Sequence, residues 1–116
     1  MKIKGFGGVF WRTKDVDSLN KWYQETLGLS MGEWNGTIIK PDADNKTAFS
    51  LFAEGNDYFP TEQAVMLNFQ VENIEAYVEH FNKIGVPLVK ELEKSDFGTF
   101  VWIADPDGRW IELWEK

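Results

Sequence analysis

The chain has 116 residues, of which 43% are apolar and 16% aromatic, with a formal net charge of −7 and no cysteine. This length and apolar content suit one compact domain or two small half-domains, and they argue against disorder. The net negative charge argues against nucleic acids and anionic membranes as partners, because both would repel a negatively charged protein. The lack of cysteine excludes disulfides, thiolate metal sites and cysteine nucleophiles.

The apolar stretches are too short to span a membrane, and the first residues, MKIKGFGG, lack the apolar core of a secretory leader. We therefore expect a cytoplasmic protein with no membrane partner. An acidic surface would attract a cationic small molecule, although the same charge also serves simply to keep a protein dispersed.

One pattern occurs twice along the chain, in residues 8–29 and again in residues 66–86. Each copy is typical of a strand, a capped amphipathic helix and a glycine that ends the helix. Asp15 and Asn73 are the expected helix caps, and each is followed two positions later by an acid that the helix dipole favours. A fold of two similar halves is expected to enclose a cleft between them.

The first half contains a predicted strand at 5–13 and a predicted helix at 16–26. The helix has an apolar face and ends at Gly28. This face comprises Leu19, Trp22, Tyr23 and Leu27. Three short strands are predicted at 31–34, 37–40 and 47–53, and the turn sequence PDADN separates the last two.

The second half repeats this order, with a predicted strand at 64–72 and a helix from residue 74 to Gly85. The inner face of this helix comprises Tyr77, Val78, Phe81 and Ile84. Pro87 begins a predicted edge strand at 88–93, since proline cannot donate to a ladder. The last two strands, 99–104 and 109–114, flank the turn sequence DPDG and predict a hairpin.

The doubled pattern, the helix that ends in Gly28-Leu29 and the closing run DPDGRWIELW together resemble the vicinal oxygen chelate superfamily. That superfamily includes glyoxalase I, extradiol dioxygenases, fosfomycin resistance enzymes and bleomycin resistance proteins. The resemblance covers essentially the whole chain. It implies an α+β fold in which two βαβββ modules, residues 1–54 and 64–116 joined by a linker at 55–63, form an open U-shaped barrel around the cleft. It also implies a homodimer.

In metal-dependent members of that superfamily, four inward-facing strand positions supply the metal ligands. Alignment on the helix caps and last strands places them at Gly8, Ser50, Met66 and Glu112, of which only Glu112 is a good donor. The single histidine, His80, lies mid-helix, where solvent exposure is the ordinary expectation. The histidine and carboxylate set of an iron, zinc or nickel centre is missing. We therefore expect no metal and no cofactor.

Side chains alternate between the faces of a strand. Residues an even number of positions away from these four, on the same strand, are therefore also expected to face the cleft. The predicted ligand-binding residues are Phe10, Arg12, Ser50, Phe52, Met66, Asn68, Gln70, Phe100, Trp102, Trp110, Glu112 and Trp114. Aromatic walls with a few polar groups suit a planar or cationic organic ligand. The tryptophans could equally well fill a closed barrel interior. The amides of Asn68 and Gln70 could equally well bond to each other or form a dimer contact.

Glu112 is the central candidate. A carboxylate among tryptophans is costly to ionise, so it is expected to titrate at raised pH or to pair with a cation, for which Arg12 is the nearest by position. Glu112 is also the tentative catalytic residue, as a general base. Base catalysis would lack an oxyanion donor other than Arg12.

Three functions remain open from the sequence. The leading hypothesis is a metal-free small-molecule-binding protein that resembles bleomycin resistance proteins and sequesters an aromatic or cationic ligand. The first alternative is a glyoxalase I-like lyase or isomerase that uses Glu112 with an atypical metal site, in which Ser50, Asn68 and Gln70 supply oxygen ligands. The second alternative is a non-catalytic protein-association domain with a plugged cleft.

Overall fold

The computed structural model describes residues 1–116 and contains two helices and one mixed four-stranded sheet. The elements in chain order are α1 (Val16–Leu27), β1 (Leu67–Gln70), α2 (Ile74–Ile84), β2 (Glu93–Ser95), β3 (Gly98–Ala104) and β4 (Trp110–Glu115). The strand order is β1-β4-β3-β2, in which β1 runs parallel to β4 and the other pairs are antiparallel. The second half therefore has the predicted order of strand, helix and three strands, and the chain has an α+β fold.

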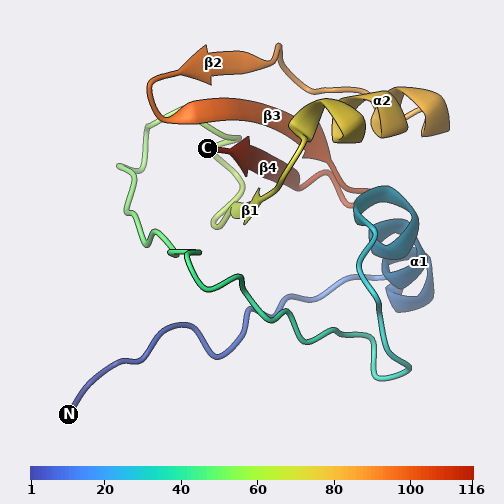
Figure 1. Cartoon of the computed structure of the whole chain (residues 1–116). Coiled ribbons are helices and arrows are strands. Elements are labelled where there is room, and N and C mark those ends of the chain that lie inside the picture. Colours follow the sequence, from blue (N-terminus) through green and yellow to red (C-terminus); the bar gives the residue numbers. More distant parts are fainter.

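The core lies between the two helices and one face of the sheet (Figure 1). Its buried members are Leu19, Tyr23, Ile74, Phe81, Val101, Ile103, Ile111 and Leu113. The predicted apolar faces of both helices are confirmed except at Ile84, which is 44% exposed. Ile84 is the last residue of α2, whereas Phe81, one turn earlier, is buried in the core.

The two helices are capped in different ways. In α1 the side chain of Asp15 accepts a hydrogen bond from the Ser18 backbone N–H at 3.1 Å, as the sequence predicts. Asn73 precedes α2 but makes no side-chain cap. Instead, the Glu115 carboxylate accepts from the backbone N–H groups of Asn73 at 2.8 Å and Ile74 at 3.0 Å. The last strand therefore caps the second helix.

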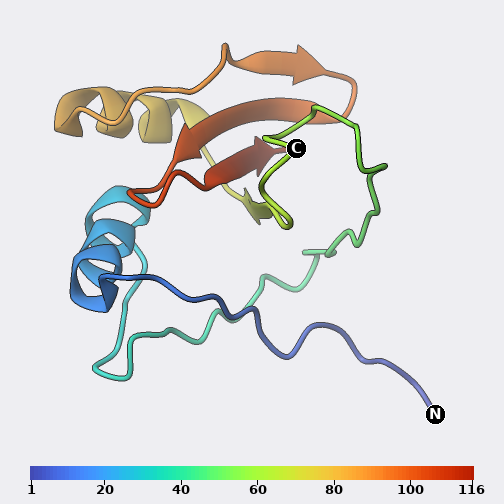
Figure 2. The same ribbon diagram turned by 180° about the vertical axis from the view of Figure 1, so that it is seen from behind.

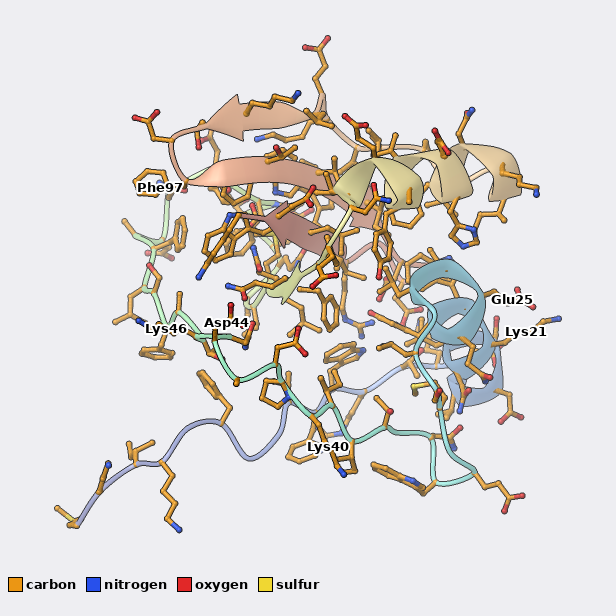
Figure 3. All side chains as sticks on the ribbon, in the orientation of Figure 1. Lys21, Glu25, Lys40, Asp44, Lys46 and Phe97 are labelled. Atoms are coloured by element: carbon orange, nitrogen blue, oxygen red, sulfur yellow. The ribbon has the colours of Figure 1, made fainter.

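The helices also contact each other. His80 of α2 is half-buried, and its Nε2 lies 2.7 Å from the Glu25 backbone oxygen of α1. The expectation that His80 is exposed to solvent is therefore wrong, because this contact covers part of the ring. Lys21 and Glu25 form an exposed ion pair on the side of α1 that points away from the sheet (Figure 3).

The hairpin between β3 and β4 is confirmed at the DPDG turn. Its ends pair through the Asp105 N–H and the Arg109 carbonyl at 2.9 Å, and Gly108 takes a φ of 85°, which favours glycine. The buried Asp105 carboxylate accepts from the Tyr23 hydroxyl at 3.1 Å and from Arg109 at 3.2 Å. The turn is thereby joined to α1. Burial and the neighbouring Asp105 carboxylate raise the pKa of Tyr23.

The strands predicted at 5–13, 31–34, 37–40 and 47–53 are absent. The backbone of residues 1–14 and 46–52 makes no hydrogen bond to any other backbone group. A strand requires a neighbouring backbone with which to pair, so alternation in the sequence does not suffice. Residues 1–14 and 46–52 run as extended chain outside the sheet, and the N-terminus lies far from it (Figures 1 and 2). The U-shaped barrel is therefore not confirmed.

Two further expectations concern the edge strand and the membrane. The strand predicted at 88–93 begins only at residue 93, and residues 88–92 make one backbone hydrogen bond to the sheet, from Val89 N–H to the Trp102 carbonyl at 2.9 Å. The sheet order places β2 at an edge, which is consistent with Pro87 shortly before it. Neither α1 nor α2 has the length and apolar character that a membrane crossing requires.

Candidate functional site

Three candidate residues form one row across the sheet. Asn68 of β1 pairs in register with Glu112 of β4, and Glu112 pairs with Trp102 of β3. Since Ile111 and Leu113 pack under the helices, Glu112 lies on the opposite face, which we call the inner face. Gln70, Trp114 and Phe100 form the next row on this face. The alternation in the sequence thus places these residues correctly.

Glu112 is only 6% exposed and receives two short hydrogen bonds. Its Oε1 accepts from the Asn68 amide at 2.6 Å, and its Oε2 accepts from the Tyr58 hydroxyl at 2.5 Å. Burial raises the pKa of Tyr58, and the Glu112 carboxylate raises it further, so the phenol remains a donor. Glu112 takes part in none of the ion pairs of the chain. Its two donors are both uncharged.

The expected pairing of Glu112 with Arg12 is wrong. Arg12 is exposed and forms no ion pair, and its backbone carbonyl accepts a hydrogen bond from the Arg109 guanidinium at 2.5 Å. Since residues 1–14 do not pair with the sheet, nothing brings the Arg12 side chain to the inner face.

Aromatic rings surround this carboxylate. The Tyr58 ring meets Trp102 edge to face at a centroid distance of 6.1 Å and lies 5.5 Å from Phe52. Phe100 stacks on Trp102 at 6.2 Å on one side and on Trp114 at 5.8 Å on the other. The inner face therefore combines a buried carboxylate with a wall of aromatic rings, the arrangement that favours organic cations.

Two lysines of the chain already lie on this wall, and the Lys116 Nζ is 5.1 Å from the centroid of the Trp114 ring. The Lys90 Nζ is 4.1 Å from the centroid of the Trp102 ring and 5.3 Å from that of Tyr58. Trp102 is fully buried, and its indole Nε1 has no hydrogen-bond acceptor. We call Tyr58, Asn68, Lys90, Trp102 and Glu112 the inner-face cluster.

A separate groove of about 420 Å³ lies beside the start of β4. Phe10, Trp11 and Trp110 contribute to its walls, and the Arg109 guanidinium lies 5.4 Å from the centre of the Trp11 ring. The Gln63 side chain donates to the Trp110 carbonyl at 2.9 Å and accepts from its N–H at 2.8 Å. This pair of bonds fixes the end of the linker against β4. Two predicted ligand-binding residues, Phe10 and Trp110, thus line the groove.

Four other predicted residues take no part in the hydrogen bonds of Glu112. Ser50 is exposed and Met66 half-buried, and neither forms a side-chain hydrogen bond. The Gln70 amide donates to the Lys46 carbonyl at 3.4 Å, and the Trp114 indole donates to the Phe97 carbonyl at 2.7 Å. Both side chains therefore hold backbone segments.

The space beside Gly8 is taken by the protein itself. A Cβ atom at this position would lie 2.7 Å from the Phe10 ring. The glycine thus makes room for its own neighbour in the chain, and this observation gives no support to a ligand there.

Tyr58 and Lys90 were not among the residues predicted from the sequence. Tyr58 lies in a segment without periodicity that we predicted to be a linker, and Lys90 precedes the edge strand. The adjacent aromatic residues Tyr58 and Phe59 were the available signal, because aromatic side chains in a linker need a surface on which to pack.

The residues do not fit the metal centre of the metal-dependent relatives. Of the four aligned positions only Glu112 offers a charged ligand, and its oxygens already accept bonds from Tyr58 and Asn68. Three or more histidine or carboxylate side chains do not converge anywhere in the chain. A transition-metal site needs several such groups at one point, which these residues do not provide.

The sequence and the fold both have known relatives. The sequence profile of the Glyoxalase/Bleomycin resistance protein/Dioxygenase superfamily matches residues 5–113. Among solved structures, a glyoxylase/bleomycin resistance protein/dioxygenase domain from Frankia sp. EAN1pec is similar with a TM-score of 0.63 and 18% identity, covering 98% of both chains. No curated protein sequence matches significantly.

Two similar structures carry different functions in their names. A lactoylglutathione lyase from Agrobacterium tumefaciens has a TM-score of 0.57 and 19% identity, covering 97% of this chain and 96% of its own. An antibiotic binding protein from Streptomyces sp. CB03234 has a TM-score of 0.57 and 20% identity, covering 88% of this chain and 87% of its own. At these identities the likeness supports the fold alone. With the profile match over nearly its whole length, the chain belongs to the Glyoxalase/Bleomycin resistance protein/Dioxygenase superfamily.

Proposed function

We propose that this protein binds a small cationic organic molecule on the inner face of its sheet and needs no metal to do so. The observation that carries the proposal is Glu112, a nearly buried carboxylate with two uncharged donors and no cationic partner. A buried negative charge is costly without a countercharge. A ligand cation would supply that countercharge.

The surroundings of Glu112 support this class of ligand. The rings of Tyr58, Trp102 and Phe100 offer π-faces to which cations bind. The net charge of −7 raises the local concentration of cations around the protein. An antibiotic binding protein has a similar fold, which makes binding of a small molecule a function that this fold can serve.

The test is a titration with two aromatic probes of similar size and opposite charge. Benzyltrimethylammonium and phenylacetate are each added to the purified protein while tryptophan fluorescence is recorded. We expect saturable binding of the cation and none of the anion. Equal binding of both, or of neither, would contradict the proposal.

A second measurement addresses the lyase alternative. Melting temperatures are recorded with Ni²⁺, Zn²⁺ and Mn²⁺, together with the metal content of the purified protein. We expect no stoichiometric metal and no specific stabilisation. One tightly held ion per chain would instead favour an enzyme with an atypical metal site.

We also infer that two copies associate through the first half of the chain. Ile38, Phe49 and Leu51 are 77%, 74% and 84% exposed, and residues 46–52 have no backbone partner. Exposed apolar residues on unpaired extended backbone are typical of surfaces that pair with another chain. A second copy offers the same extended segments, so the pairing is self-complementary.

Light scattering on the eluted protein tests this association. The wild type is expected to elute as a dimer and Phe49→Asp as a monomer. Phe97→Asp is the matched control, because Phe97 is similarly exposed (77%) but lies at the turn between β2 and β3. A monomeric wild type would contradict the inference.

A further inference from the structure

Lys90 occupies the place that the proposed ligand would take. Its ammonium lies over Trp102 and Tyr58 at 4.1 and 5.3 Å from the ring centroids, and the Tyr58 hydroxyl is bonded to Glu112. The side chain is 31% exposed, so the cation lies at the entrance of the cluster and not within the core. The chain thus supplies its own occupant for the aromatic wall.

We propose that Lys90 is a tethered competitor, and that the ligand is an alkylated ammonium compound that displaces it from Trp102 and Tyr58. This proposal rests on the function proposed above and adds the ligand class and the residue that sets its affinity. A lysine ammonium is compact and strongly hydrated, whereas an alkylated ammonium loses less hydration when it leaves water for an aromatic surface. The exchange therefore favours the alkylated cation.

The displaced lysine has an alternative partner. Lys90 Nζ lies 3.3 Å from the Glu93 carboxylate, and both side chains reach solvent. When a ligand covers the rings, Lys90 can keep this ion pair and leave only the aromatic faces. Displacement thus costs Lys90 its cation–π contact but not its ion pair with Glu93. Competition from Lys90 therefore weakens ligand binding without preventing it.

Trp102 provides a specific reporter of the exchange. Its indole N–H is buried and has no acceptor, and the face of its ring meets Lys90. The indole resonance is identified in a ¹H–¹⁵N spectrum by its absence from Trp102→Phe. Benzyltrimethylammonium is then titrated into the wild type, Lys90→Met and Lys94→Met. Lys94 is an exposed lysine of β2, so its substitution makes the same change in charge.

We expect Lys90→Met to lower the Kd about tenfold relative to the wild type, as loss of one competing cation–π contact implies, and Lys94→Met to match the wild type within about twofold. Lys90→Gln, which keeps a polar end group, should behave as Lys90→Met. Equal Kd values for the wild type and both Lys90 variants would overturn this proposal and leave the proposed function intact. Absence of binding to every protein would overturn both.

Discussion

The second half of the chain forms a paired sheet, whereas the first half contributes one helix and extended segments without backbone partners. β3 and β4 lie at the centre of the sheet, and three of the fully buried residues, Val101, Trp102 and Ile103, belong to β3. By contrast, Ile3, Phe10 and Ile38 are 90%, 90% and 77% exposed. The two halves carry similar sequence patterns, so an alternating pattern specifies a strand only where a partner backbone is available.

Hydrogen exchange gives the largest contrast between the two regions. Amides of Val101 and Leu113 are expected to exchange only on global unfolding, about 10³-fold or more slowly than amides of residues 46–52 in dilute protein. On concentration, protection should appear in 46–52 as copies associate. Equal protection of both regions in dilute protein would mean that the backbone of residues 46–52 is hydrogen-bonded like that of the sheet.

Truncation of a buried ring is the next largest effect. Phe81→Ala is expected to lower the free energy of unfolding by about 3–5 kcal/mol, because Phe81 is only 1% exposed and lies in the core cluster. Phe49→Ala, measured by urea denaturation at concentrations where monomer dominates, should cost less than about 0.5 kcal/mol. Similar losses would mean that residues 46–52 pack on the sheet.

The cap that β4 provides to α2 is a smaller test. Glu115→Ala removes both acceptors from the Asn73 and Ile74 N–H groups and should cost about 1–2 kcal/mol. Glu91→Ala, at an exposed position without a side-chain bond, is the control. If both variants unfold at the same urea concentration, the cap contributes nothing.

The pH dependence of stability tests the contact between Tyr58 and Glu112, which joins the linker to the sheet. The pKa of Tyr58 is raised on folding, so the folded state keeps the phenol proton longer than the unfolded chain. The contribution of the protonated Tyr58 to the free energy of unfolding is complete below about pH 10, the usual tyrosine pKa. This contribution is lost as the pH rises further.

Denaturation at several pH values above 10 is the corresponding measurement. Tyr58→Phe should reduce the fall in unfolding free energy by up to about 1.4 kcal/mol per pH unit. Tyr23 adds a loss of the same sign, since burial also raises its pKa, so Tyr23→Phe is the comparison variant. A slope unchanged by Tyr58→Phe would contradict the hydrogen bond between Tyr58 and Glu112.

Local features of this fold could be predicted from the sequence. The face of α1, its Asp15 cap and the DPDG hairpin depend on residues within a few positions of one another, and all three are confirmed. The common face of the sheet on which Asn68, Trp102 and Glu112 lie also follows from the alternation of side chains within single strands.

Contacts distant in sequence could not be predicted. Glu115 caps a helix 41 residues away, and Tyr58 reaches Glu112 across 54 residues. Arg12 fails for the same reason, because its predicted place depended on a strand that finds no partner within the chain. The division into two modules, the cytoplasmic location and the ligand-binding roles stay predictions.

Glu112 is the carboxylate that we propose attracts a cationic ligand, and calorimetric titration of benzyltrimethylammonium into Glu112→Gln tests this role most directly. We predict a Kd about tenfold or more above that of the wild type, since the substitution removes the charge and keeps the shape. Glu91→Gln, which makes the same change in net charge on the surface, should leave the Kd within about twofold. Wild-type affinity in Glu112→Gln would contradict a role of this carboxylate in ligand binding.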